Sequence, residues 1–361
     1  MKLSDVCTKG TSNIAQKDLD ARNGTYPIYG ASGFIKNVDF YHQEKPYIAI
    51  VKDGAGVGRV MQLPAKSSVI GTMQYIIPNE GVSVEYLAYA LEHMNLSKYY
   101  LGAAIPHIYF KDYCNEPLPN HTQEEQEQIS RTLETITDLI SLRKQQLAKL
   151  DELVKSRFIE MFGDPVQNPM GWTETTIGKE CYYIKDGPHK SLDDLGEGNG
   201  YPFISVRNIV NGYIDFSTAR YISEKDYFES IKKCHPQKGD MLYSKGGTTG
   251  IAKLVDIDVE FANWVHVAVL KFDKTLDGVF FENMLNSDYC YTQSQKLTKG
   301  IANRDLVLSA MAQIRFYKPP LHLQQQFAAF VKQTDKSKFE IQKSLEKLET
   351  LKKSLMQKYF G

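Results

Sequence analysis

The segment Lys149–Ser156, with the sequence KLDELVKS, returns as KLETLKKS at Lys347–Ser354, 198 residues later. Each copy runs six residues further and ends in the same pair, Phe162–Gly163 and Phe360–Gly361. A separation that stays constant along two similar segments is the mark of an internal repeat. The chain of 361 residues therefore consists of two copies of one unit.

The same separation holds upstream of these segments. The matched pairs there are Gly102 and Gly300, Ala104 and Ala302, and Gln126 and Gln324, with Ile129 opposite Phe327. Each unit has a front that differs between the copies and a back that is shared. The fronts are residues 1–117 and 164–318, and the backs are residues 118–163 and 319–361.

Each back is predicted to be one long helix, because its apolar residues recur in alternating steps of three and four, a heptad pattern. The seam positions are Ile129, Leu133, Ile136, Ile140, Leu147 and Leu150 in the first back, and Phe327, Val331, Ile341, Leu345, Leu348 and Leu355 in the second. Thr122 and Glu125 form a predicted capping box, and Gly163 suits the left-handed position after a helix. Such seams need a partner. Pairing between two chains is one solution, but the tether within one chain favours intramolecular pairing.

The fronts are predicted to be α+β domains of short strands and loops. Tyr47–Val51 and Val265–Leu270 are rich in β-branched residues and bounded by turn residues, as strands are. One short helix is expected in each front, near Val84–Met94 and Phe280–Leu285.

Each front also carries a glycine-rich turn. Asp53–Gly58 follows a predicted strand, which is where a phosphate or S-adenosylmethionine loop would lie, and a methyltransferase is one alternative on that ground. Such a loop needs a helix directly after it. Here Arg59–Pro64 resembles a second strand, and Ile251–Val255 does the same after Gly246–Gly250. Both turns are therefore interpreted as β-hairpins.

No catalytic residue or metal site is expected from the sequence. The five cysteines never form a C-x-x-C pair, and the histidines lack helical metal spacing. The 43 basic residues balance the 43 acidic ones, which argues against a protein that coats nucleic acid by bulk charge. No apolar run reaches the roughly 18 residues of a membrane span. Scattered cysteines without a disulfide pattern fit a cytoplasmic protein.

Polar and basic side chains at the predicted turns can read base edges, arginine or lysine on guanine and asparagine or glutamine on adenine. The predicted DNA-contacting residues are Lys52, Arg59, Gln74, Ser205, Arg207, Asn208, Ser244, Lys245, Thr248, Thr249, Lys299 and Asn303.

Several segments, in this doubled order, carry a family likeness. They are Pro319–Phe327 (PPLHLQQQF), Pro117–Pro119 followed by Glu125–Gln126, Tyr26–Gly33 (YPIYGASG) and Gly239–Ser244 (GDMLYS). With them the chain resembles the specificity subunit of type I restriction–modification enzymes along nearly its whole length. The resemblance implies two target-recognition domains and two spacer helices paired as an antiparallel coiled coil with pseudo-two-fold symmetry.

The resemblance further implies a non-catalytic subunit whose fronts each read one half of a bipartite site in double-stranded DNA. Two methyltransferase subunits, and motor–nuclease subunits in systems that also cleave, are the implied partners. S-adenosylmethionine, ATP and Mg belong to those partners and not to this chain. The alternatives are a system that only methylates and a coiled-coil scaffold without DNA contact. Because neither front is basic overall, we expect the isolated chain to bind DNA weakly.

Overall fold

The computed structural model describes residues 1–100, 106–301 and 303–361. The repeat matches at Gly102, Ala104 and Ala302 lie outside the described residues. The described chain divides into two compact parts. Unit 1 contains residues 1–146 and 341–361, and unit 2 contains residues 147–340.

Two helices of 40 residues each dominate the shared backs: α4 (Gln123–Phe162) and α10 (Leu321–Phe360). The predicted capping box is confirmed, because the Thr122 N–H donates to the Glu125 carboxylate at 2.7 Å and the Glu125 N–H donates to the Thr122 hydroxyl at 3.3 Å. Gly163 adopts the predicted left-handed conformation after α4, with φ of 76°.

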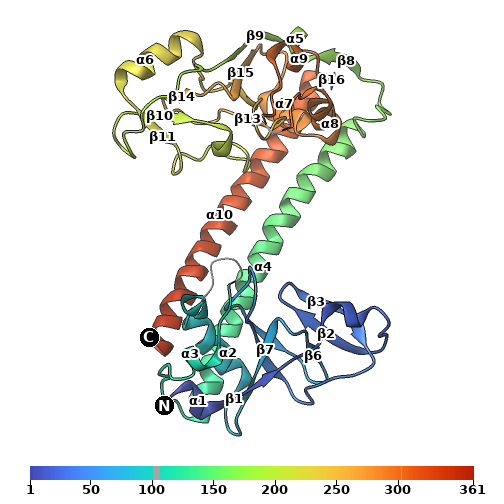
Figure 1. Ribbon diagram of the computed structural model, residues 1–361. Helices are drawn as coiled ribbons and strands as arrows, with labels where there is room; N and C mark the ends of the chain where they lie inside the picture. The colour runs from blue at the N-terminus through green and yellow to red at the C-terminus, as the bar shows by residue number, and fades with distance from the viewer. Residues whose placement is uncertain (101–105, 302) are drawn as a thin grey trace. The chain divides into compact units, whose positions relative to one another are not determined.

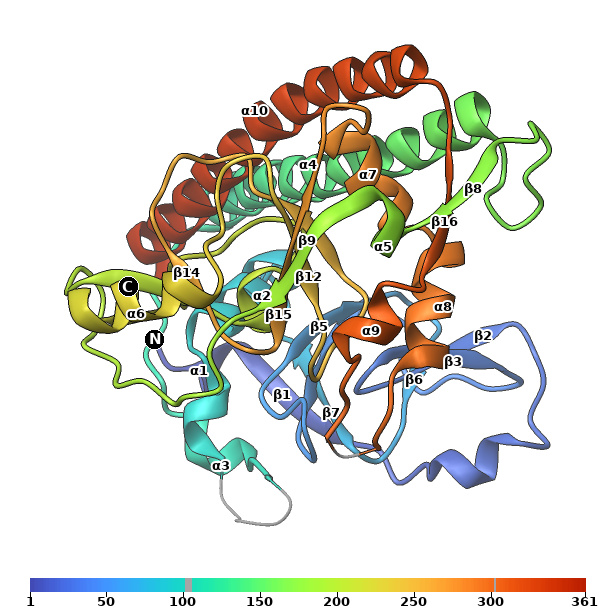
Figure 2. The same cartoon turned by 90° about the horizontal axis from the view of Figure 1, so that it is seen from above.

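The two helices pair with each other inside the chain and run antiparallel. In unit 1, Ile129 and Leu133 near the start of α4 pack with Met356 near the end of α10. In unit 2, Phe158 near the end of α4 packs with Phe327 near the start of α10. Figures 1 and 2 show the two helices side by side within each unit. The prediction of intramolecular pairing is thus confirmed.

All twelve predicted seam side chains are buried or half-buried. Charged residues that interrupt the seam make contacts between the helices. Lys338 pairs with Asp151 at 2.6 Å, and the Arg157 guanidinium lies 5.8 Å from the centre of the Phe330 ring. The interruptions therefore add polar contacts to an otherwise apolar seam.

The front of unit 1 contains two sheets, of strand order β1-β7-β4-β5 and β3-β2-β6. Among the described strands of this front, β2 and β6 pair in parallel and the other neighbours pair antiparallel. Its strands are β1 (Cys7–Thr11), β2 (Tyr26–Gly30), β3 (Gly33–Val38), β4 (Tyr47–Val51), β5 (Val60–Leu63), β6 (Ser68–Val69) and β7 (Met73–Pro78). Its helices are α1 (Leu3–Val6), α2 (Val84–His93), α3 (Phe110–Tyr113) and two 3-10 turns, η1 (Gln16–Leu19) and η2 (Leu96–Tyr99).

The front of unit 2 repeats both sheets, in the orders β9-β15-β12-β13 and β11-β10-β14, and adds a β8–β16 pair. Its strands are β8 (Thr173–Thr176), β9 (Cys181–Asp186), β10 (Tyr201–Ile204), β11 (Arg220–Ile222), β12 (Met241–Ser244), β13 (Ala252–Leu254), β14 (Ala262–Asn263), β15 (Val267–Phe272) and β16 (Arg315–Lys318). Its helices are α5 (Ile177–Glu180), α6 (Glu224–Lys233), α7 (Gly278–Leu285), α8 (Asp288–Leu297), α9 (Leu308–Met311) and the 3-10 turn η3 (Val206–Asn208).

The predicted α+β fronts are therefore confirmed, as are the short helices α2 and α7. The matching sheets also show that the two fronts share one fold, although their loops differ in length. In unit 2, α6 and α8 are additions, because the one helix of similar length in the described front of unit 1, α2, corresponds to α7.

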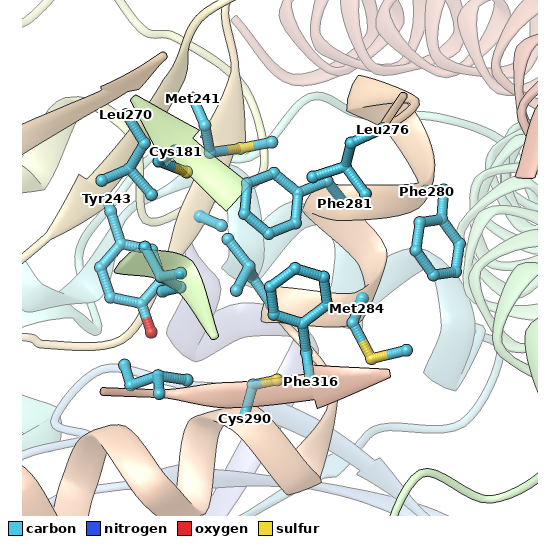
Figure 3. Packing of buried hydrophobic residues seen from close by; sticks show 14 of the residues in the cluster. Cys181, Met241, Tyr243, Leu270, Leu276, Phe280, Phe281, Met284, Cys290 and Phe316 are labelled. Atoms are coloured by element: carbon cyan, nitrogen blue, oxygen red, sulfur yellow. The ribbon is translucent and has the colours of Figure 1, made fainter. Parts of the chain in front are cut away.

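The core of unit 2 lies where the front meets the two long helices. The ring centres of Phe281 and Phe316 lie 5.1 Å apart, and Figure 3 shows both side chains in this cluster. Cys181 and Cys290 are buried in the same cluster, and burial raises the pKa of each thiol to about 12. These thiols are packing groups rather than nucleophiles.

One glutamine in each copy of the repeat fastens the front to its long helix. The side-chain oxygen of Gln126 accepts from the N–H of Ser83, the residue that caps α2, at 3.2 Å. In unit 2, the side-chain oxygen of Gln324 accepts from the N–H of Asp277, which caps α7, at 2.8 Å. The two amide groups also donate to the carbonyls five residues upstream. We call this contact between a front and its long helix the joint. The repeat therefore preserves the joint as well as the apolar seam between the two helices.

Replacing Gln324 by leucine is expected to lower the free energy of unfolding of unit 2 by about 1–3 kcal/mol, because two buried backbone groups lose their partner. Urea unfolding followed by tryptophan fluorescence measures this, since both tryptophans, Trp172 and Trp264, lie in unit 2. The neighbouring Gln325 is exposed, so Gln325→Leu is the matched control and should leave the midpoint unchanged. Equal effects of the two variants would contradict this role of Gln324.

Candidate nucleic-acid interface

The glycine-rich turn of the second front is tied to two distant segments by backbone hydrogen bonds. The Lys245 N–H donates to the His266 carbonyl at 2.8 Å, and the Leu306 N–H donates to the Lys245 carbonyl at 2.7 Å. The Gly247 N–H donates to the Arg304 carbonyl at 3.0 Å. We name residues 245–250, 299–301 and 303–306 the recognition loops of the second front.

The first front builds the same frame. The Lys52 N–H donates to the Thr72 carbonyl, the Ile108 N–H donates to the Lys52 carbonyl and the Gly54 N–H donates to the Pro106 carbonyl, each at 3.0 Å. Residues 106 and 108 match residues 304 and 306 at the separation of 198 seen in the helices. The repeat therefore extends into the loops at the same separation.

The side chains on this shared frame differ. In the second front, the Lys245 ammonium lies 2.9 Å from the Asp305 carboxylate and 3.5 Å from that of Asp186, and Lys245 is 5% exposed. In the first front, the position of Asp305 is taken by His107, which pairs with Asp53. A common backbone thus presents different chemical groups in the two fronts.

Five of the twelve predicted DNA-contacting side chains are buried: Gln74, Asn208, Ser244, Lys245 and Thr249. Apart from the ion pairs of Lys245, their partners are the Tyr113 hydroxyl for Gln74, the Asp215 carbonyl for Asn208, the Ile251 N–H for Ser244 and the Thr298 hydroxyl for Thr249. The structure therefore buries five of the predicted residues among tertiary partners, and the DNA contacts themselves stay predictions. A polar side chain near a turn can serve the local structure instead of a ligand.

The other seven are accessible. Arg59, Arg207, Thr248, Lys299 and Asn303 are exposed, and Lys52 and Ser205 are half-buried. Thr248, Lys299 and Asn303 come together on the recognition loops of the second front. Arg207 lies on a separate turn, where its guanidinium donates to the Thr218 carbonyl. Lys52 and Arg59 flank the hairpin turn of the first front.

Three residues near the frames were not predicted: Asp305, His107 and Tyr109. Tyr109 is 48% exposed, and its ring centre lies 4.1 Å from that of His107. The Arg304 guanidinium donates to the side chain of Gln295. Residues just upstream already matched at the separation of 198. Extending this match by a few positions would have identified the segments around His107 and Asp305.

The glycine-rich turn of the first front is a hairpin turn. Residues Gly54–Gly58 connect β4 and β5, which pair antiparallel, so the segment that directly follows the turn is a strand and not a helix. The hairpin interpretation is confirmed in both fronts, since β12 and β13 also pair antiparallel.

A pocket of about 430 Å³ in unit 2 lies between β13, α7 and α10. Its lining includes Lys253 and Glu282, which pair at 3.0 Å. Burial raises the pKa of Glu282, and the nearby Lys253 ammonium opposes that shift. This charge pair is part of the packing of α7, because Glu282 also accepts from the Leu254 N–H at 2.9 Å.

Among the described residues, no group of three or more histidine, cysteine or acidic side chains could hold a metal ion. No helix in the described ranges is long and apolar enough to cross a membrane.

The comparisons with known proteins agree with one another. The family model described as type I restriction modification DNA specificity domain matches residues 1–152 and 169–353. The chain is 25% identical over 349 residues to the type I restriction enzyme MjaVIII specificity subunit of Methanocaldococcus jannaschii, covering 90% of this chain and 81% of the relative. It is 24% identical over 217 residues to the MjaIX specificity subunit of the same organism, covering 54% and 49%.

Solved structures show the same fold. The S subunit of a type I restriction–modification system from M. genitalium superposes with a TM-score of 0.66 at 15% identity, covering 100% of this chain and 95% of that one. A chain from a structure of the type I R-M system gives a TM-score of 0.54 at 15% identity, covering 99% and 96%. With a family model that matches most of its length, the chain belongs to the type I restriction modification DNA specificity family, as a specificity subunit.

Proposed function

We propose that this subunit reads a bipartite site in double-stranded DNA, with each front contacting one half. The first front reads with the turn around Lys52 and Arg59, and the second front reads with its recognition loops. The two long helices set the number of unread base pairs between the halves. Because the exposed side chains of the two fronts differ, the two half-sites differ in sequence.

The observation that carries this proposal is the backbone frame that the chain builds twice. In both fronts, three bonds of the same pattern hold a glycine-rich turn beside a segment near the end of the front. Protein dimers contact the two half-sites of a duplex in this way, with two copies of one DNA-reading element. Here the two DNA-reading fronts belong to one chain, so the side chains of each front can differ from those of the other.

The helices offer matching surfaces for two copies of one partner. Leu153 on α4 and Leu351 on α10 are separated by 198 residues and are 47% and 46% exposed. A single exposed leucine is an ordinary surface residue, so what supports a contact here is its recurrence at the same position of both copies of the repeat. We assign these two positions to two methyltransferase subunits.

In this proposal the chemistry belongs to the partners. The methyltransferase subunits supply S-adenosylmethionine and methylate N6 of an adenine that has left the base stack. Motor–nuclease subunits, in a system that also cleaves, use ATP and Mg. This chain contributes sequence reading and the joints that hold the fronts on the helices.

A domain exchange tests the proposal. Residues 164–318 are replaced by the corresponding front of another family member, the chimera is expressed with its methyltransferase partner, and methylated adenines are mapped by sequencing. One half of the methylated motif should change, while the other half and the gap stay the same. The reciprocal chimera is the control and should acquire the lost half.

Three outcomes would contradict parts of the proposal. If both halves stay unchanged, the second front does not read DNA. If the assembled complex shows no salt-dependent preference for a bipartite site, the chain is a scaffold. If the purified chain methylates DNA without a partner, it is itself a methyltransferase.

A further inference from the structure

Ile301 is the one large apolar side chain among the described residues that is 100% exposed. It lies in a recognition loop of the second front, between Lys299 and Asn303, whose side chains are also exposed. Leaving a branched aliphatic side chain in water forgoes about 1.5–3 kcal/mol of burial. An apolar side chain among polar and basic neighbours is therefore suited to a ligand in which a small apolar area is surrounded by polar or charged groups.

The loop that carries Ile301 is closed and anchored at its base. The Lys299 N–H donates to the Asp305 carbonyl and the Asp305 N–H donates to the Lys299 carbonyl, both at 2.9 Å. The Asp305 carboxylate is held in turn by the buried Lys245 ammonium at 2.9 Å. The base of the loop is therefore fixed on the second front.

Gly300, directly before Ile301, fixes the turn. Its φ is 85°, a left-handed value that side chains disfavour, and a Cβ there would lie 2.2 Å from the Asn303 carbonyl oxygen. The turn therefore requires glycine at this position, which directs residue 301 outward.

We propose that Ile301 is a wedge that enters between two stacked base pairs of the half-site read by the second front. This proposal rests on the proposed function. Proteins that bend DNA insert isoleucine, leucine or phenylalanine into a base step, and the partly unstacked duplex then follows the protein surface. Lys299 contacts the flanking phosphates, and Asn303 and Thr248 contact base edges beside the opened step. Unstacking by the wedge assists the removal of the target base from the helix by the partner.

The test uses the complete methyltransferase complex and duplexes that carry 2-aminopurine at successive positions of the half-site. In the wild-type complex, fluorescence should rise at one step besides the methylated adenine. Ile301→Ser should abolish that rise and slow methylation about tenfold, the scale of losing an unstacking contact. Ile301→Leu should keep both, and the methylated motif should be the same in all variants.

The matched control is Val259→Ser. Val259 is a branched aliphatic residue, 47% exposed, in the loop between β13 and β14, and its replacement should change neither signal. If Ile301→Ser keeps the wild-type fluorescence and rate, there is no wedge, although the reading function stands. If Ile301→Ser instead releases the methyltransferase partner in gel filtration, Ile301 is a protein contact and the wedge is refuted. If the wild-type complex methylates no bipartite motif, the proposed function itself fails.

Discussion

Replacing Phe327 by alanine is expected to lower the free energy of unfolding of unit 2 by about 4 kcal/mol, within the range for phenylalanine removed from a packed core. Phe327 is fully buried. Its ring meets those of Phe158 at 5.4 Å and Phe162 at 5.6 Å, nearly edge to face in both cases. Phe280 of α7 closes the group from the front, 5.0 Å from Phe162. Alanine would leave a cavity where both long helices and the front meet.

Tryptophan fluorescence during urea unfolding reports this change directly. The indole of Trp172 donates to the Phe162 carbonyl at 2.9 Å, so one probe lies at the end of α4 itself. The control is Phe339→Ala on the same helix, because Phe339 is 64% exposed. It should shift the unfolding free energy by no more than about 0.5 kcal/mol. Similar losses for the two variants would show that α10 does not pack through the Phe327 cluster.

The helices could be predicted because their information is local and repeated. A heptad seam names its buried face without reference to the rest of the chain, and the constant separation between Lys149–Ser156 and Lys347–Ser354 marks both copies. The joint at Gln126 and Gln324 was visible as a match in the repeat. Its role was not, because the partners Ser83 and Asp277 lie 43 and 47 residues away.

The glycine-rich turns could be predicted to be hairpins, but which of their side chains are exposed could not be predicted. Lys52 and Lys245 look alike in sequence, since each directly precedes its turn, yet Lys245 is buried and Lys52 is half-buried. The difference comes from Asp186 and Asp305, which lie 59 and 60 residues from Lys245 along the chain. No local pattern signals such a distant partner. Ile301 was missed for a related reason, because exposure of an apolar residue depends on what the fold leaves uncovered.

Replacing Lys245 by methionine is expected to destabilise unit 2 by about 3 kcal/mol, because it removes one partner from buried ion pairs. Methionine keeps most of the length of the side chain, so the loss reports the charge rather than a cavity. Asp186 is 8% exposed and keeps only Lys233, at 2.8 Å. The Asp305 carboxylate can be hydrated instead, since its side chain is 46% exposed. The loss of unfolding free energy is therefore expected at the lower end of the range for a broken buried ion pair. Adding Asp305→Asn should recover part of the loss, because the two sites are coupled.

The same variant separates an anchor from a phosphate contact, which are the two roles open to a lysine in this turn. An anchor predicts a lower unfolding midpoint, whereas Lys299→Met, at an exposed lysine of the same loops, leaves the midpoint unchanged. A phosphate contact predicts the reverse pattern for Lys245: unchanged unfolding and a shallower dependence of DNA affinity on salt, by about one phosphate. Burial at 5% exposure and two carboxylates within 3.5 Å favour the anchor. Lys245 then acts on recognition through Asp305, by holding the base of the loop that presents Ile301 and Asn303, so Lys245→Met should also weaken methylation of the half-site read by the second front.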